Sequence, residues 1–348
     1  MGESMTEARL PTNGAPDHGV KWSLEHRLDA SSFADQLEEV AKHFETNKID
    51  VPINELAIAL LALSVRQFVL LAGPPGCGKS SLVRTIAYLL GKSPGPEFIE
   101  VSVQAHWLND RQLFRKKGPF GNVSLGASPL VLFDEFNLAR PEYYLSRLFH
   151  TSDVRERGAK PAIADFDWRA FGTLNIDETS RPPSAKVVDR CMLLELDQVD
   201  HSVSGRAGID LKDCPKLAGL PSVPEGADAE LDPVIEACLA ALADSVKLGH
   251  LRHDLLPSRR VMRDIHAMLA LHRTLDLENR GLLTRNEVVD RLLASRVLVK
   301  ISGAYEQVEP ALTAIESSLK GFGNLAQTQR RLQVARRQRQ LGFVSPWQ

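Results

Sequence analysis

The sequence predicts an α/β fold in which a parallel sheet, covered by helices on both faces, is followed by a small all-helical domain. Three observations predict it. Residues 68–72 form an all-apolar run, which is typical of a strand buried on both faces. A glycine-rich loop and a helical pattern follow that run directly. From residue 231 onward the pattern is wholly helical, which marks a second domain.

The composition is that of a two-domain protein without a membrane segment. The chain has 348 residues, of which 43% are hydrophobic, so it can bury a sizeable core. Its longest apolar run near the loop, Leu56 to Val65, ends at Arg66 and is too short to cross a bilayer. The N-terminus lacks the charged and then apolar pattern of a signal peptide. We therefore expect a cytoplasmic protein.

The cysteines and the overall charge exclude two further classes. Cys77, Cys191, Cys214 and Cys238 are scattered and form no C-x-x-C pair, which argues against a zinc site or a disulfide framework. The formal net charge is −2, so no global charge points to nucleic acid.

Two helices are predicted ahead of the first strand. The first begins near Ser32 with Asp35 three residues on, and the second begins near Asn54 and leads into the strand. Neither carries a chemical signature. The residues before position 30 lack periodicity and are expected to be flexible or to lie over a partner.

The loop after the first strand fits G-x-x-x-x-G-K-[ST], the phosphate-binding P-loop, and is followed by a helix that ends at Gly91. Its glycines leave backbone N–H groups open to a β-phosphate, and the helix N-terminus adds partial positive charge. Lys79 would reach the β- and γ-phosphates, and the Ser80 hydroxyl would bind Mg²⁺. The predicted nucleotide-binding residues are Gly73, Pro74, Pro75, Gly76, Cys77, Gly78, Lys79, Ser80 and Ser81.

Two acids follow a later buried strand. A strand is predicted over residues 98–103, and residues 130–133 form a second apolar run that ends in Asp134 and Glu135. Ligands of open α/β sheets bind at the carboxyl edge of the strands. Asp134 would hold Mg²⁺ through water, and Glu135 would orient or deprotonate the attacking water. The alternative is an ordinary solvated acidic turn.

An amide and an arginine complete the candidate catalytic set. Asn175 ends a further strand and could bond the γ-phosphate or the lytic water; otherwise it is an Asx-turn residue. Arg190, ahead of a strand over 191–196, could reach the nucleotide of a neighbouring subunit; otherwise it is a surface arginine. Arg181 and Lys186 are lesser candidates for that role.

The second half of the chain is predicted to be helical. Asp232 with Pro233 caps one helix, Pro257 opens another, Thr284 with Glu287 forms a capping box, and Pro310 opens a fourth. Arg260 could contact the nucleotide from this lid, or could be a solvated arginine. The predicted division is an N-terminal extension with a helix (1–52), a large nucleotide-binding domain (53–198), a linker (199–230), a helical lid (231–322) and a basic C-terminal helix and tail (323–348).

The tail is unevenly charged. Residues 322–348 contain no acid, so this stretch carries +5 and the rest of the chain −7. Three uses remain open: a solvated face, phosphate contacts to DNA, or a partner-docking helix with an aromatic anchor. The arginines concerned are Arg330, Arg331, Arg336, Arg337 and Arg339.

Taken together, these motifs resemble an AAA+ ATPase module. The resemblance is carried by GPPGCGKS at 73–80, LVLFDEFNLARPEYY at 130–144, the asparagine in 172–177 and VVDR at 187–190. The McrB-like group of restriction and defence systems is similar in its D-E-x-N-L-A-R-x-E-x-Y run. It is also similar in its W-x-x-x-R-x-L segment, seen here at 107–113, and in its lid, seen here at 258–265 and 299–303. The resemblance covers roughly residues 53–320.

The resemblance implies roles and partners. By position, Lys79 and Ser80 form Walker A, Asp134 and Glu135 Walker B, and Asn175 is sensor 1. Arg190 is the finger that acts in trans and Arg260 is sensor 2. A homo-oligomeric ring, commonly hexameric, with ATP or GTP and Mg²⁺ at its interfaces is expected. McrB has N-T-A-D at sensor 1 where Ile176 follows Asn175 here, so ATP is expected over GTP. With about 50 residues ahead of the module, target recognition is expected in another subunit.

Three functions follow as hypotheses. The first is an NTPase that drives or gates a partner effector, such as a nuclease subunit, in an anti-phage or DNA-processing system. The second is a nucleotide-gated oligomeric scaffold that recruits an effector to DNA. The third is a MoxR-like chaperone that remodels a protein partner.

Overall fold

The structure is a computed structural model that describes residues 27–121, 123, 127–156, 168–175, 183–196, 211–224 and 230–345. Several predictions made above lie outside the described residues: those on the first 26 residues, on Arg181, on most of the linker and on the last three residues of the tail. Among the helices that are described, none is long and apolar enough to cross a membrane.

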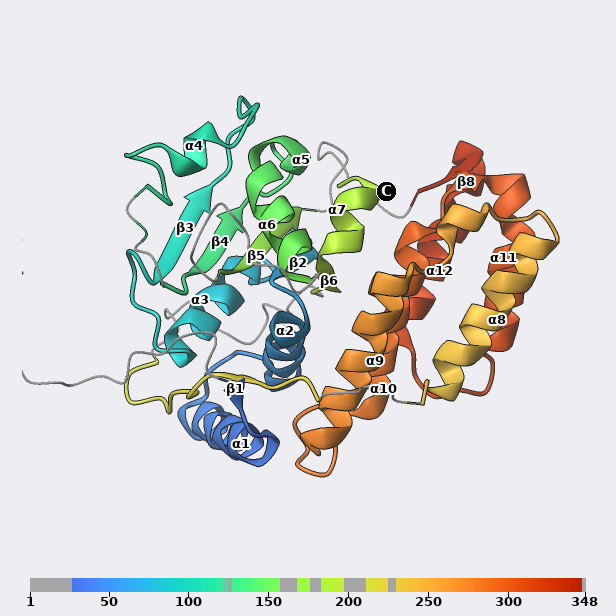
Figure 1. The fold of residues 1–348 in the computed structure, drawn as a ribbon. Coiled ribbons are helices and arrows are strands. Elements are labelled where there is room, and N and C mark those ends of the chain that lie inside the picture. The colour runs from blue at the N-terminus through green and yellow to red at the C-terminus, as the bar shows by residue number, and fades with distance from the viewer. Residues whose placement is uncertain are drawn as a thin grey trace, which may run out of the picture.

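A five-stranded, all-parallel sheet forms the first lobe, at the left of Figure 1. The strand that leads to the P-loop does not lie beside the strand that ends in two acids, because a third strand is inserted between them. Parallel strands bring their carboxyl ends to one edge of a sheet, where ligands bind. In spatial order the strands are β3 (Phe98–Ser102), β4 (Leu130–Asp134), β5 (Arg169–Asn175), β2 (Phe68–Gly73) and β6 (Met192–Glu195).

Helices cover both faces of this sheet. The side chains of β2 point alternately into the two apolar cores that these helices form with the sheet. Val69 and Leu71 belong to one apolar core, whereas Phe68, Leu70 and Ala72 belong to the other. The predicted three-layer α/β fold is therefore confirmed. The first core includes residues of α1 (Ala30–Asn47), α2 (Ile53–Val65) and α3 (Lys79–Leu89); the second includes residues of α4 (Arg111–Phe114), α5 (Pro141–Tyr144), α6 (Ser146–Glu156) and α7 (Ala185–Arg190).

Gly172 fixes how closely the loop after β4 packs on β5. A Cβ at this position would lie 2.8 Å from the Phe136 ring and 2.9 Å from the Leu70 side chain. Phe136 is fully buried, and its backbone N–H donates to Thr173 O over 2.9 Å. The absence of a side chain at Gly172 thus lets the segment that follows the two acids lie directly on the neighbouring strand.

The second lobe is helical and lies at the right of Figure 1. The predicted N-cap Asp232 accepts from Val234 N, and the predicted capping box of Thr284 and Glu287 is present. A π-helical segment, Leu293–Val297, continues α10. The helices are α8 (Pro233–Lys247), α9 (Arg259–Thr274), α10 (Arg285–Leu292), α11 (Tyr305–Ser318) and α12 (Ala326–Arg337).

Two predicted helix starts in this lobe are wrong. Helix α9 begins after Ser258, whose side chain accepts from Val261 N, rather than at Pro257. Pro310 lies inside α11, which begins at Tyr305. A proline inside a helix removes one backbone hydrogen bond. Burial of Tyr305 and Val308 extends the helix in spite of that loss.

Short strands join distant parts of the chain. In the segment predicted to be a linker, β7 (Leu220–Pro221) pairs in parallel with β1 (Arg27–Leu28). Near the C-terminus, β8 (Gly303–Ala304) pairs antiparallel with β9 (Phe343–Val344), so the chain end is held against the helical lobe.

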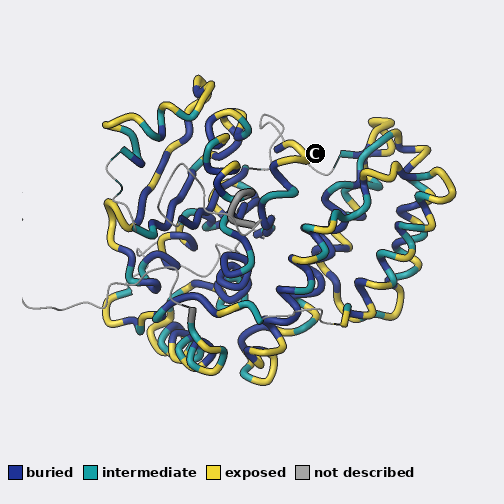
Figure 2. The backbone as a smooth tube through the Cα atoms, in the orientation of Figure 1, coloured by how far each residue is buried: buried dark blue, intermediate teal, exposed yellow. Residues whose placement is uncertain are grey.

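The two lobes share one apolar core. The cluster of buried residues that includes α1, α2 and α3 continues into α8 to α12 without a break. Figure 2 shows buried stretches both in the sheet lobe and on α9 and α10 of the helical lobe. Buried charged groups cross the same junction: Arg66 Nε donates to Asp264 Oδ1 over 2.7 Å, and Arg296 also pairs with Asp264. The helical lobe is therefore docked on the sheet lobe.

Candidate nucleotide site

The predicted site residues of three adjacent strands meet at the carboxyl edge of the sheet. Gly73, where β2 enters the P-loop, pairs in register with Asn175 at the end of β5. Asp134 ends β4 on the other side of β5 and pairs with Ser102 of β3. The residues predicted to bind phosphate and metal therefore lie together, although 102 residues separate Gly73 from Asn175 in the chain.

The P-loop has the backbone that its sequence predicts. Gly76 and Gly78 have φ angles of 80° and 88°, a region that favours glycine, and α3 begins at Lys79 with Gly78 as its N-cap. The Lys79 side chain is buried, and its ammonium donates to Gly73 O over 3.0 Å and to Pro74 O over 2.8 Å. The ammonium is thus held inside the curve of the loop, next to the N-terminus of an 11-residue helix.

Three side chains share a hydrogen-bond chain beside the P-loop. The Ser80 hydroxyl donates to Asp134 Oδ1 over 2.9 Å, and the Thr173 hydroxyl donates to the same oxygen over 2.6 Å. Thr173 is in β5, the strand inserted between the other two. Its hydroxyl therefore fixes the carboxylate of Asp134 in the orientation in which that carboxylate meets Ser80.

Glu135 is held by the same hydroxyl. Its backbone N–H donates to Thr173 Oγ1 over 3.0 Å, and its φ of 55° places it in the left-handed region, which is uncommon for a residue with a side chain. Its side chain is exposed. The left-handed backbone directs Asp134 and Glu135 differently, one toward Ser80 and the other toward solvent at the same edge.

The donor set fits a magnesium ion. Mg²⁺ prefers oxygen ligands and is usually bound by one or two protein groups together with waters and substrate phosphates. A serine hydroxyl and a carboxylate 2.9 Å apart beside the P-loop match that preference. The described residues contain no group of three or more His, Cys, Asp or Glu that could hold a metal without such outside ligands.

Arg190 is not near the P-loop of its own chain. It ends α7 two residues before Met192, which pairs with Val69 at the start of β2, whereas the P-loop follows the other end of that strand. At a rise of ~3.3 Å per residue the separation along the strand direction is about 20 Å. The Arg190 guanidinium lies over the Phe149 ring, 5.8 Å from its centroid, and donates to Lys186 O over 3.3 Å.

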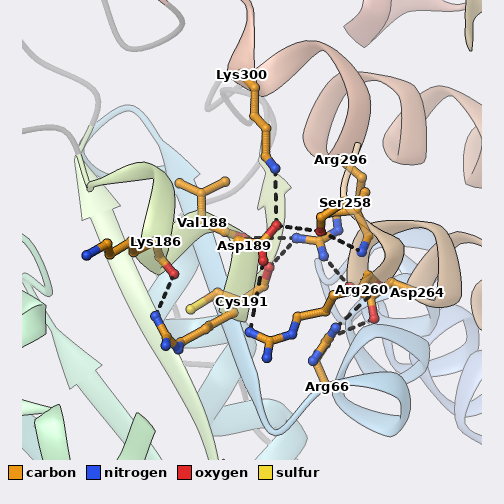
Figure 3. Close-up of polar contacts among 12 residues, drawn as sticks. Arg66, Lys186, Val188, Asp189, Cys191, Ser258, Arg260, Asp264, Arg296 and Lys300 are labelled. Atoms are coloured by element: carbon orange, nitrogen blue, oxygen red, sulfur yellow. Dashed lines mark hydrogen bonds and ion pairs between the residues drawn. The ribbon is translucent and has the colours of Figure 1, made fainter. Parts of the chain in front are cut away.

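Arg260 lies at the same edge as Arg190, away from the P-loop. Its backbone oxygen accepts from Arg66, two residues before β2, and its guanidinium lies 3.9 Å from Asp189 Oδ2. Figure 3 shows Arg260 beside Asp189, the residue that precedes Arg190 on α7. The structure thus brings Arg260 and Arg190 together and brings neither to the Lys79 ammonium.

Asp189 joins the two lobes at this point. Ser258 Oγ donates to Asp189 Oδ1 over 2.8 Å, and Lys300 Nζ donates to the same oxygen over 3.1 Å. Partial burial opposes ionisation, but these two contacts outweigh it and hold the pKa of Asp189 below its ordinary value. The carboxylate therefore stays charged at neutral pH and anchors Arg260.

The structure adds two elements that the sequence did not single out. Thr173 is one, and its only signal was a hydroxyl among the otherwise apolar residues 170–174. The other is a pocket of about 240 Å³ between the start of the P-loop and α12. Its lining includes Gly73, Pro74, apolar residues of the helical lobe, and Arg330 and Arg331 of the predicted basic tail. Arg331 is paired with Glu195 at the end of β6, beside β2.

Comparison with known proteins finds one family model and a solved structure that are similar to this chain. Residues 69–142, which run from β2 to the start of α5, match the family described as "ATPase family associated with various cellular activities (AAA)". The matched segment lies in the sheet lobe and includes the P-loop and both acids.

A similarity of fold covers most of the chain. The crystal structure of a candidate ATPase from Cytophaga hutchinsonii ATCC 33406 is similar, with a TM-score of 0.50 over 84% of this chain and 95% of that one. The two sequences are 16% identical, so the similarity is one of fold. No curated protein matches the chain.

Proposed function

We propose that this chain is an Mg²⁺-dependent nucleoside triphosphatase, with ATP favoured over GTP, in which the triphosphate is bound by one copy and hydrolysed with the help of the next. The observation that carries the proposal is the hydrogen-bond chain from Ser80 through Asp134 and Thr173 to the Glu135 backbone. It joins the P-loop to the two acids at the edge where nucleotides bind in this class of sheet.

Each residue of the site is proposed to have a separate role in binding or hydrolysis. The N–H groups of the P-loop and the Lys79 ammonium would bind the phosphates, and Ser80 and Asp134 would hold the magnesium ion, which supplies charge neutralisation on the phosphates when bound. Glu135, exposed beside them, would accept the proton of the attacking water. Asn175, in register with Gly73, would bond the γ-phosphate or that water.

The pocket between the P-loop and α12 would receive the base and ribose. It begins at Gly73 and Pro74 and continues along apolar side chains of the helical lobe: Leu298, Ile301, Leu312, Leu332 and Val334. Ligand pockets are typically apolar with a few polar groups that fix orientation. Here Glu195 and Arg331 are those groups. Because Arg331 belongs to α12, a bound nucleotide would touch both lobes.

A ring is proposed because the arginines lie at the wrong edge for a single copy to use. Along the strand direction, Arg190 lies roughly 20 Å from its own P-loop, from a rise of ~3.3 Å per residue. This separation supports the role of a finger that acts on a neighbouring copy. Asp189 holds Arg260 beside it, so both are proposed to meet the phosphates of the next copy. A head-to-tail interface generates a closed ring where its rotation divides a full turn, and we propose that arrangement here. The resemblance to McrB-like proteins supports a hexamer that gates a partner effector such as a nuclease subunit.

The experiment separates nucleotide binding from hydrolysis. Turnover of ATP and of GTP is measured in parallel on the purified chain with magnesium, and binding is followed with a fluorescent nucleotide. We expect Glu135→Gln to bind as the parent chain does and to turn over ~10²–10⁴-fold more slowly, the usual contribution of a general base. We expect Lys79→Ala to lose binding. Turnover near the parent rate in Glu135→Gln would remove Glu135 from the mechanism.

A further inference from the structure

A short basic segment projects from the sheet lobe and has no part in the site described above. Residues 111–117 contain Arg111, Arg115, Lys116 and Lys117, and all four are exposed. Within the described part of the chain none of the four forms an ion pair, and the one acid beside them, Asp110, is bonded to Arg147 over 3.1 Å. Figure 2 shows this part of the chain, around α4 at the upper left of the sheet lobe, as exposed.

Aromatic packing and a backbone hydrogen bond anchor the segment to the sheet lobe. The rings of Phe114 and Phe120 stack with centroids 5.3 Å apart, and the Arg147 guanidinium lies 4.3 Å from the Phe114 ring centroid. Phe120 N donates to Leu113 O over 2.9 Å, which closes the turn. The aromatic rings therefore face the protein and the cations face outward.

The C-terminal helix, by contrast, uses part of its charge internally. Arg331 pairs with Glu195, and Arg336 lies 2.9 Å from Glu316 Oε2 and 3.5 Å from Glu309 Oε1. Arg337 and Arg339 are left exposed. The strongest concentration of exposed cations in the described part of the chain that pair with no acid is therefore the segment 111–117.

We infer that the segment 111–117 is a binding surface for the phosphate backbone of a nucleic acid. Its chemistry favours this partner over an acidic protein, because protein interfaces are anchored by apolar and aromatic side chains at their centre. The one aromatic side chain of this segment, Phe114, stacks on Phe120 instead of being presented to solvent. Nucleic-acid phosphates are bound by such exposed Lys and Arg side chains, without any apolar anchor.

The surface is joined to the nucleotide site by the backbone. The loop that carries it leaves β3 directly after Ser102, which pairs with Asp134, and Val103 N donates to Asp134 O over 3.0 Å. A shift of Asp134 would therefore move the root of this loop. The inferred binding itself does not depend on nucleotide hydrolysis.

The test compares two variants that each lose three exposed cations. One is Arg115→Gln/Lys116→Gln/Lys117→Gln, and the control is Lys320→Gln/Arg337→Gln/Arg339→Gln. Binding of labelled 30-nucleotide single-stranded and duplex DNA is measured by fluorescence anisotropy, without nucleotide, from 50 to 200 mM salt. We expect the slope of log K against log salt to flatten by roughly 2–3 in the first variant, about one per lost contact, and to be unchanged in the control.

Three outcomes would overturn the inference. They are equal slopes in the two variants, an effect confined to the control, and no DNA binding by the parent chain at 50 mM salt. Binding of polyglutamate as tightly as DNA would assign the surface to an acidic protein instead. Equal melting temperatures of the variants and the parent exclude misfolding. Because nucleotide is absent, loss of hydrolysis would leave this result unaffected, and the two proposals can fail separately.

Discussion

Thr173 donates a hydrogen bond of 2.6 Å to Asp134 and accepts one of 3.0 Å from the backbone N–H of Glu135. One hydroxyl thus orients both acids of the candidate site, and it comes from the strand that separates them from the P-loop strand. The relationship explains how Glu135 is kept in the left-handed region, since an uncommon backbone conformation persists only where its surroundings hold it.

Replacement of Thr173 by valine tests this positioning role. The variant keeps the shape of the side chain and loses both hydrogen bonds, so we expect turnover to fall ~10–100-fold, the usual effect of removing a group that orients a metal or catalytic residue. Nucleotide binding should change little, because both hydrogen bonds of the Thr173 hydroxyl are to the acidic pair and neither is to the P-loop. Thr173→Ser is the matched control and should keep most of the activity. Equal loss in both variants would argue against the hydroxyl.

Asp264 holds the two lobes together, as Figure 3 shows, because it pairs with both Arg66 and Arg296. All three side chains are buried. Asp264→Asn leaves two buried arginines without their carboxylate, and we expect a loss of about 3–5 kcal/mol in the free energy of unfolding, measured by urea denaturation. Asp244→Asn, which breaks an exposed pair with Lys247, should cost well under 1 kcal/mol. Similar losses in the two variants would contradict this account of the junction.

The lowered pKa of Asp189 predicts a pH-dependent contribution to stability. A carboxyl group whose pKa is lower in the folded chain stabilises it above the ordinary value of 3.8, and that contribution is lost as the pH falls through the folded value. We expect Asp189→Asn to be less stable than the parent by about 1.5–3 kcal/mol at pH 7, the range for hydrogen bonds to a charged group. The difference should narrow as the pH falls below 3.8 and the carboxyl group becomes protonated. A constant difference from pH 7 to pH 2.5 would show that ionisation of Asp189 is not the cause.

Features that depend on residues adjacent in the chain could be predicted from the sequence. The apolar strands, the P-loop, the two acids and the capping box depend on neighbouring residues, and the structure has them at the predicted positions. Pro310 shows the limit of local rules, because tertiary burial of Tyr305 and Val308 extends α11 past the start that the proline suggests.

Long-range relationships could not be read from the sequence. Nothing local to Thr173 shows that β5 lies between β4 and β2, so its contact with Asp134 appears only in the folded chain. The same holds for Arg331: a basic helix looks solvated until the fold places its arginine against Glu195, 136 residues away. Arg260 was expected to contact a nucleotide from the lid, and within its own chain the contact with Asp189 keeps it at the opposite edge of the sheet.

The central proposal is that the triphosphate lies between the P-loop of one copy and Arg190 of the next, and mixing two inactive variants tests it most directly. Lys79→Ala lacks the P-loop lysine, and Arg190→Ala lacks the finger, so each alone should hydrolyse ATP at a small fraction of the parent rate. In an equal mixture, roughly one head-to-tail interface in four joins an intact P-loop to an intact Arg190. We therefore predict that the mixture recovers about a quarter of the parent turnover per site. A mixture that assembles and stays as inactive as its components, or an Arg190→Ala chain as active as the parent, would contradict the proposal.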